Sequence, residues 1–80
     1  MRLSIHSLQK TLFQGEAEKI IARTPMGEIT VLDGHIPLVT PLTGLELRVV
    51  DKKGISDIIT LVSGFLEVRP ESEVVILANQ

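Results

Sequence analysis

Cysteine, tryptophan and tyrosine are absent from the sequence, and Phe13 and Phe65 are its only aromatic residues. Without cysteine the chain can form no disulfide bond and offers no thiol nucleophile. The opening segment MRLSIHSLQK lacks the apolar stretch of a signal peptide, and no apolar run approaches the ~20 residues that cross a bilayer. We therefore expect a chain without a membrane span, in a cytosolic rather than a secreted setting.

The chain also lacks a large excess of either positive or negative charge. Eight basic and ten acidic residues give a formal net charge of −2, and Lys52-Lys53 is the only adjacent basic pair. A protein that binds the phosphate backbone needs a basic face, and one that binds single strands also needs stacking aromatic side chains. Neither feature is present, so we expect no nucleic-acid partner.

Aliphatic residues dominate instead. Of all residues 44% are hydrophobic, and most of these are isoleucine, leucine or valine. Abundant β-branched residues favour a sheet protein whose two faces are largely covered. A chain of 80 residues makes one domain, residues 1–80, and buries only about 60% of the surface of its unfolded state. The apolar excess therefore also indicates that a partner covers part of the surface.

Hydrophobic residues alternate along most of the chain, most clearly at Leu45, Leu47 and Val49. No window sustains the i, i+3, i+4, i+7 spacing of an amphipathic helix over three turns. Strands are predicted around residues 3–6, 11–13, 20–22, 28–32, 45–49, 55–62, 65–69 and 74–77. Turn signals separate many of them, at 24–27, 33–34, 51–54 and 70–73. This spacing predicts an all-β fold, an antiparallel sandwich or barrel.

The glycines are spread along the chain, whereas a phosphate-binding loop would cluster them before a helix. We therefore expect no nucleotide cofactor, and we predict structural turns at Gly44, Gly54 and Gly64. Gly64 follows Ser63 inside an apolar run, which indicates a bulge or a close backbone approach. We favour a corner of the sandwich there.

The most particular segment is GEITVLDGHIPLVT, residues 27–40, which places His35 two residues after Asp33. Catalysis would need a nucleophile or second titratable group beside the histidine in a formed pocket, and Ser63-Gly64 is only a fragment of a nucleophile elbow. With one other histidine and no cysteine, the chain lacks the nitrogen and sulfur ligands of a structural zinc site. We interpret Asp33 and Gly34 as turn formers and His35 as a loop or contact residue, with no metal and no catalytic residue.

Five motifs in one order resemble a known family. They are KTLFQGE (10–16), GEITVLDGHIPL (27–38), GLELR (44–48), SGFLEV (63–68) and VVILA (74–78). Together they resemble the N-terminal domain of the epsilon subunit of the rotary F-type ATP synthase, the subunit called delta in mitochondria. The resemblance covers nearly the whole chain and implies a small β-sandwich of two antiparallel sheets.

The resemblance also implies a function. In that family the domain is a non-catalytic part of the central stalk that binds the gamma subunit and rests on the c-ring, coupling proton or sodium translocation to ATP synthesis. It implies a peripheral place on the cytoplasmic face of the bacterial inner membrane, and no cofactor. By position, Glu28 and His35 would contact the polar loops of the c-ring from one loop, with Asp33, Gly34 and Ile36 beside them. Without gamma, we expect the isolated chain to be prone to self-association.

The sequence departs from the family pattern in several places. Asp33 stands where the family commonly has proline, the segment 35–44 is one residue shorter than usual, and Ser63 replaces the first glycine of a common Gly-Gly-Phe. Most bacterial members continue into a C-terminal helical hairpin that can inhibit ATP hydrolysis, whereas this sequence ends at Gln80. The resemblance is therefore to the sandwich half alone.

Two other functions stay open on the sequence. One is a small β-sandwich enzyme that uses His35 and Asp33 as an acid–base pair, which requires the two side chains to converge in a concave pocket. The other is a stand-alone β-sandwich adaptor that serves a different scaffold.

Overall fold

Every regular element of the structure, a computed structural model that describes residues 1–80, is a β-strand. The expected all-β fold is therefore confirmed, and the structure holds no helix that could cross a membrane. The strands are β1 (Arg2–His6), β2 (Thr11–Glu16), β3 (Lys19–Thr24), β4 (Gly27–Leu32), β5 (Leu38–Val50), β6 (Ser56–Thr60), β7 (Ser63–Arg69) and β8 (Glu73–Asn79).

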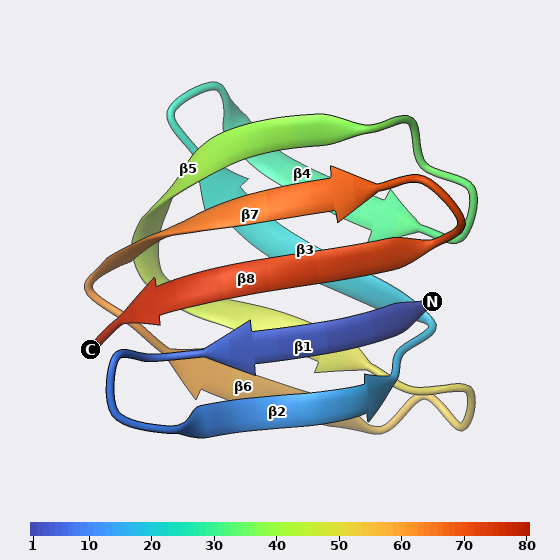
Figure 1. Cartoon of the computed structure of the whole chain (residues 1–80), viewed down its shortest axis with the longest axis horizontal. Coiled ribbons are helices and arrows are strands. Elements are labelled where there is room, and N and C mark those ends of the chain that lie inside the picture. The colour runs from blue at the N-terminus through green and yellow to red at the C-terminus, as the bar shows by residue number, and fades with distance from the viewer.

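The strands form two layers that share one strand (Figure 1). The first layer has the order β2-β1-β8-β7-β5, and the second has the order β4-β3-β5-β6. All neighbours are antiparallel except β1 and β8, which run parallel. The chain is thus a β-sandwich, as the resemblance implied.

Strand β5 passes from one layer to the other. Its first half, Leu38–Leu42, pairs with β7, and its second half pairs with β3 and β6. Gly44 lies at the crossing with a φ of 82°, a backbone conformation that glycine adopts without strain. Gly44 therefore bends a strand and does not form the separate turn that we predicted.

The first half of β5 was not predicted, because Pro41 and Gly44 interrupt the alternation of hydrophobic residues there. Leu38–Leu42 has a neighbour, β7, on one side only. A proline is tolerated in such an edge segment, because its missing N–H is needed only where a second strand would pair. Gly54, in contrast, lies in the β5–β6 turn with a φ of 81°, as predicted.

The alternating residues meet between the two layers. Ile5, Leu66 and Ile76 from the first layer, and Ile20 and Val31 from the second, have no exposed surface. They belong to one cluster of 16 buried hydrophobic residues. Each fully buried aliphatic side chain of this size contributes about 1.5–3 kcal/mol relative to its exposed state, so the interlayer contact is the main source of stability.

Gly64 lies inside β7, where it is paired with Leu42 on one side and Ala78 on the other. The predicted sandwich corner at Gly64 is therefore wrong, and so is the predicted turn; the chain changes layers at residues 61–62, between β6 and β7. A Cβ at Gly64 would collide with the carbonyl oxygen of Leu77. The glycine is required by a close approach of two backbones.

Replacing Gly64 with alanine should lower the free energy of unfolding by about 1–3 kcal/mol, because the added methyl group forces β7 and β8 apart. Urea denaturation measures this change. Gly15→Ala is the matched control, since a Cβ there would meet only Phe13 Cε1 at an ordinary 3.9 Å. An unchanged midpoint for Gly64→Ala would show that the strands do not approach as closely as described.

Candidate functional site

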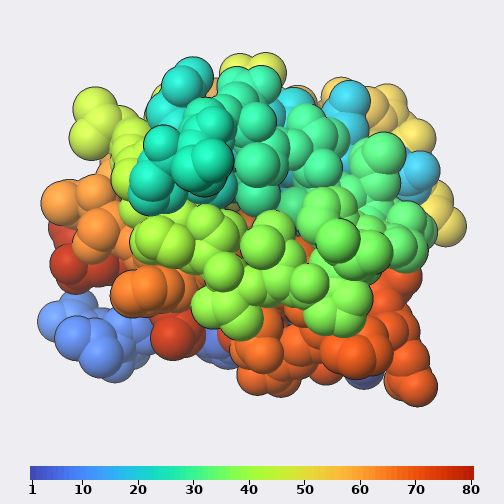
Figure 2. Space-filling view, turned by 90° about the horizontal axis from the view of Figure 1, so that it is seen from above, coloured from blue at the N-terminus to red at the C-terminus, as the bar shows by residue number.

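The residues that the resemblance singled out lie along one long side of the sandwich. Strand β4 is the edge of its layer and pairs only with β3. Figure 2 looks onto this side, and the residues from the β3–β4 turn to β5, coloured teal to green, cover it together. This side therefore presents β4, the turn before it and the loop after it.

We expected Glu28 to lie on the same loop as residues Asp33–Ile36, and this expectation is wrong. Glu28 is the second residue of β4, and Asp33 follows the last. Five steps along an extended chain separate the Cα atoms of Glu28 and Asp33 by roughly 16 Å, at ~3.3 Å a step. The two groups thus occupy opposite ends of the same exposed edge.

At the first end, Glu28 lies beside the rigid β3–β4 turn. Its Oε2 is 3.9 Å from Arg23 Nη2 across the two strands, a distant and exposed ion pair that contributes little. The buried hydroxyl of Thr24 donates to the Gly27 carbonyl at 2.9 Å and accepts from the Met26 amide at 3.1 Å. These bonds hold the turn so that Met26 projects with 95% of its surface exposed. The sequence analysis did not single out Met26, although an apolar residue between Pro25 and Gly27 was a signal.

At the second end, Asp33 contacts the amino group of the chain. Its Oδ1 lies 2.7 Å from the nitrogen of Met1, whose side chain is buried. The same ammonium donates to the Ala17 carbonyl at 2.9 Å and lies 3.4 Å from Glu16 Oε2. The ammonium is therefore held from three directions. No sequence pattern predicts this contact, because residues 1 and 33 are brought together only by the tertiary structure.

The contact shifts both pKa values. The hydrogen bond from the Met1 ammonium, and its charge, lower the pKa of Asp33 against a smaller opposing effect of desolvation, and Ser72 and Lys52 act in the same direction as the ammonium. For the Met1 amino group, desolvation is the largest single effect and lowers the pKa. The hydrogen bonds and charges of Asp33 and Glu16 together outweigh it, so the pKa is raised.

His35 and Asp33 are not joined. The Nδ1 of His35 lies 2.7 Å from the carbonyl oxygen of Ile36; a carbonyl can only accept, so Nδ1 carries the proton. The His35 amide donates to the Leu32 carbonyl at 3.1 Å, and the Gly34 amide donates to Ser72 Oγ at 3.1 Å. The side chains of His35 and Asp33 thus contact other groups and not each other. The geometry therefore does not support the hypothesis that they form a catalytic acid–base pair.

The outer face of the first layer is apolar at one end. Pro41, Phe65 and Leu77 are neighbours across β5, β7 and β8, and Phe65 and Leu77 each keep 57% of their surface exposed. A hollow of about 380 Å³ lies between Phe65, Leu77 and the β1–β2 turn, whose Leu8 is fully exposed. We call Leu8, Val39, Pro41, Phe65 and Leu77 the apolar face.

Ion pairs occupy the other end of the same outer surface. Arg69 Nε lies 3.1 Å from Glu67 Oε1, and Arg2 Nη2 lies 3.3 Å from Glu73 Oε2. The surface is thus divided into an apolar part and a charged part.

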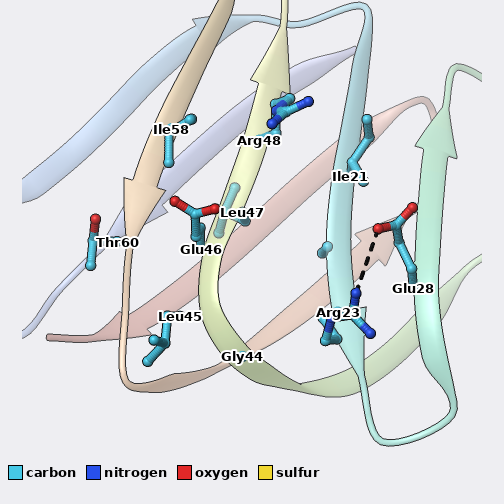
Figure 3. Close-up of a pocket in the computed structure, with 11 residues that line it drawn as sticks. Ile21, Arg23, Glu28, Gly44, Leu45, Glu46, Leu47, Arg48, Ile58 and Thr60 are labelled. Atoms are coloured by element: carbon cyan, nitrogen blue, oxygen red, sulfur yellow. Dashed lines mark ion pairs between the residues drawn. The ribbon is translucent and has the colours of Figure 1, made fainter.

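The second layer also carries an open hollow on its outer surface, of about 660 Å³ (Figure 3). Ile21 and Ile58 lie among charged side chains there, including Glu46 and Arg48, and Glu28 reaches its rim with Arg23. No histidine, serine or cysteine lines it, and its lining mixes aliphatic side chains with charged ones. No group of three or more histidine, aspartate or glutamate side chains is placed to hold a metal ion.

A family model described as the ATP synthase delta/epsilon chain beta-sandwich domain matches residues 1–80. The chain is 40% identical over 80 residues to the ATP synthase epsilon chain of Alkalihalophilus pseudofirmus, covering 99% of this chain and 58% of that protein. It is 42% identical over 67 residues to the epsilon chain of Exiguobacterium, covering 84% of this chain and 48% of that protein. The chain therefore spans about half the length of these relatives.

Solved structures agree with the sequence relatives. A chain of the Euglena gracilis mitochondrial ATP synthase, solved with its OSCP, F1 and c-ring, superposes with a TM-score of 0.91 at 28% identity over 98% of this chain and 49% of that chain. A chain of the Tetrahymena thermophila mitochondrial ATP synthase central stalk and c-ring superposes with a TM-score of 0.84 over 100% of this chain and 63% of that chain. At 14% identity the second likeness shows the fold alone.

The Asp33–Met1 contact predicts a pH-dependent stability difference between the wild type and Asp33→Asn. Because the pKa of Asp33 is lowered on folding, the contact stabilises the folded state fully above the unfolded pKa of Asp33, about 3.9. This stabilisation is lost as the pH falls through the lower pKa of the folded state. Because the pKa of the Met1 amino group is raised on folding, the same stabilisation is fully present below the unfolded pKa of that group, about 8. It is lost as the pH rises through the higher pKa of the folded state. The difference in unfolding free energy should therefore be largest between about pH 5 and 8 and shrink on both sides.

Urea titrations at pH values within, below and above this range measure the difference. Glu28→Gln is the control, because its carboxylate makes only the distant contact with Arg23. A difference between the wild type and Asp33→Asn that stays constant with pH would contradict the ion pair.

Proposed function

Because the chain belongs to the family of ATP synthase delta and epsilon chain beta-sandwich domains, we propose that it is a non-catalytic subunit of the central stalk of a rotary F-type ATP synthase. The observation that carries the proposal is the match of the family model along the whole chain. In this role the chain binds the gamma subunit and contacts the c-ring, so that proton or sodium translocation is coupled to ATP synthesis. It sits peripherally on the cytoplasmic side of the membrane that holds the ring.

The apolar face is the best candidate for the gamma-binding surface. It combines a flat aromatic, Phe65 on β7, with exposed apolar side chains on the two neighbouring strands, β5 and β8, and on the β1–β2 turn. Burial of such surface contributes about 25 cal/mol for each Å² before the costs of association are subtracted. The charged end of the same layer adds orientation, since polar contacts at the rim of an interface confer register more than affinity.

The β4 side is the best candidate for the ring contact. Glu28 and the Asp33–Ile36 loop present polar groups at the two ends of one exposed edge, and Met26 and Ile36 add exposed apolar contacts. A contact made at two separated points resists rotation of one body against the other better than a contact at one point. This arrangement suits a subunit that turns together with a ring.

Chemistry at His35 has no support in the geometry, because its imidazole bonds its own loop and Asp33 bonds Met1. An adaptor on another scaffold would use the same exposed surfaces. Binding to gamma and to the ring therefore separates the proposed function from that alternative.

Phe65→Ser should weaken binding to gamma by about tenfold or more, because aromatic side chains at the centre of an apolar contact carry much of the binding energy. Titration calorimetry with purified gamma measures the loss. Ile58→Ser is the matched control, since Ile58 is 51% exposed on the outer surface of the other layer. Equal losses for both variants, or none for either, would contradict the apolar face as the gamma site. The same substitution should reduce any self-association of the isolated chain.

Glu28→Ala and His35→Ala should leave gamma binding intact and reduce the amount of c-ring that co-purifies with the chain–gamma complex. The reason is that both residues lie on the β4 side and outside the apolar face. Asp57→Ala on β6, at the opposite edge of the same layer, is the control. Full retention of the ring by both variants would count against contact through this side.

A further inference from the structure

Few contacts hold the Asp33–Ile36 loop in place. Ile36 is 75% exposed, and no atom lies within 4 Å of the position that a Cβ on Gly34 would occupy. The two hydrogen bonds of His35 are local: its amide donates to the carbonyl of Leu32, the last residue of β4, and its Nδ1 donates to the carbonyl of Ile36. The loop is thereby joined to the end of β4 but not to the first layer. Its conformation relative to the rest of the sandwich must therefore depend on longer-range contacts.

Two such contacts join the loop to one corner of the first layer. Asp33 binds the Met1 ammonium, and the Gly34 amide donates to the hydroxyl of Ser72 in the β7–β8 turn. The corner is itself fixed, because Met1 donates to the Ala17 carbonyl and the Arg2 amide donates to the Ser72 carbonyl at 2.9 Å. The loop follows β4, in the second layer, so the contacts clasp the two layers together at this end.

The backbone is strained at Ser72 and at the residue before it. Glu71 and Ser72 have φ values of 66° and 55°, in the left-handed region that side chains other than glycine rarely adopt. The turn has three residues, because Arg69 pairs with Glu73, and positions of positive φ in hairpin turns ordinarily take glycine or asparagine. The hydroxyl of Ser72 makes a contact that glycine could not make, whereas no hydrogen bond or ion pair joins the Glu71 side chain to the loop.

We propose that Asp33 and Ser72 are positioning residues that lock the Asp33–Ile36 loop onto the corner formed by Met1 and the β7–β8 turn. The lock holds the loop rigid in the free chain, before any partner binds. Its use in presenting the loop to a ring rests on the proposed function, but its existence does not.

Backbone ¹⁵N relaxation of the isolated chain tests the lock directly. In the wild type, His35 and Ile36 should have order parameters near the ~0.85 of rigid backbone, and in Asp33→Asn and Ser72→Gly they should fall toward ~0.6. His35 and Ile36 are suitable reporters because neither bonds to Asp33 or Ser72.

Glu71→Gly is the matched control, since it relieves strain in the same turn without removing a contact to the loop. Both glycine variants should keep or raise the urea midpoint, because glycine adopts a positive φ without strain. Ser72→Gly should nevertheless loosen the loop while Glu71→Gly does not. A loop that stays rigid in Asp33→Asn and Ser72→Gly overturns the lock, and so does a loop that loosens equally in Glu71→Gly.

The outcome is separable from that of the proposed function, because no partner is present in the relaxation experiment. A mobile loop in the variants supports the lock even if the ring is retained without Glu28 and His35. A rigid loop in the variants overturns the lock even if ring binding depends on the β4 side.

Discussion

The pairing of β5 with both layers is the constraint on which the rest of the structure depends. One half of the strand is paired with β7 and the other half with β3 and β6, with Gly44 at the crossing. Since a single strand belongs to both layers, the layers cannot slide without breaking one set of its hydrogen bonds. The buried aliphatic side chains then fill a gap of fixed geometry.

This constraint also relates the exposed surfaces to one another. The apolar face lies on the outside of the first layer, and the β4 side belongs to the edge of the second. Their relative orientation follows from β5 at one end of the sandwich and is reinforced by the Asp33–Met1 and Gly34–Ser72 contacts at the other. Two surfaces held in a fixed orientation fit the proposed contacts with the gamma subunit and the c-ring.

Most of the fold could be predicted from the sequence because alternation reports which side of a strand is buried. The prediction failed where a residue's role depends on a neighbour distant in sequence. Gly44 was predicted as a turn, and residues 38–42 were not predicted as a strand, because the place of Pro41 and Gly44 depends on the free edge of β5 and on its crossing. Gly64 was taken as a corner because only the position of Leu77 shows the close approach.

The candidate site shows the same limit. Glu28 and His35 are seven positions apart, and the strand predicted at 28–32 already conflicted with the single loop that the resemblance implied for them. The contact of Asp33 with Met1 joins two chain positions that share no local pattern. The apolar excess predicted that a partner covers part of the surface, whereas the position of the exposed apolar face on Phe65 and Leu77 required the register of β7 and β8.

Hydroxyl-radical footprinting of the chain, free and bound to its gamma subunit, tests the central claim most directly. The account predicts that oxidation of Phe65 and Leu77 falls on binding while oxidation of Ile58, on the outer surface of the other layer, is unchanged. Protection of Ile58 with Phe65 left reactive would contradict the assignment of the apolar face to gamma.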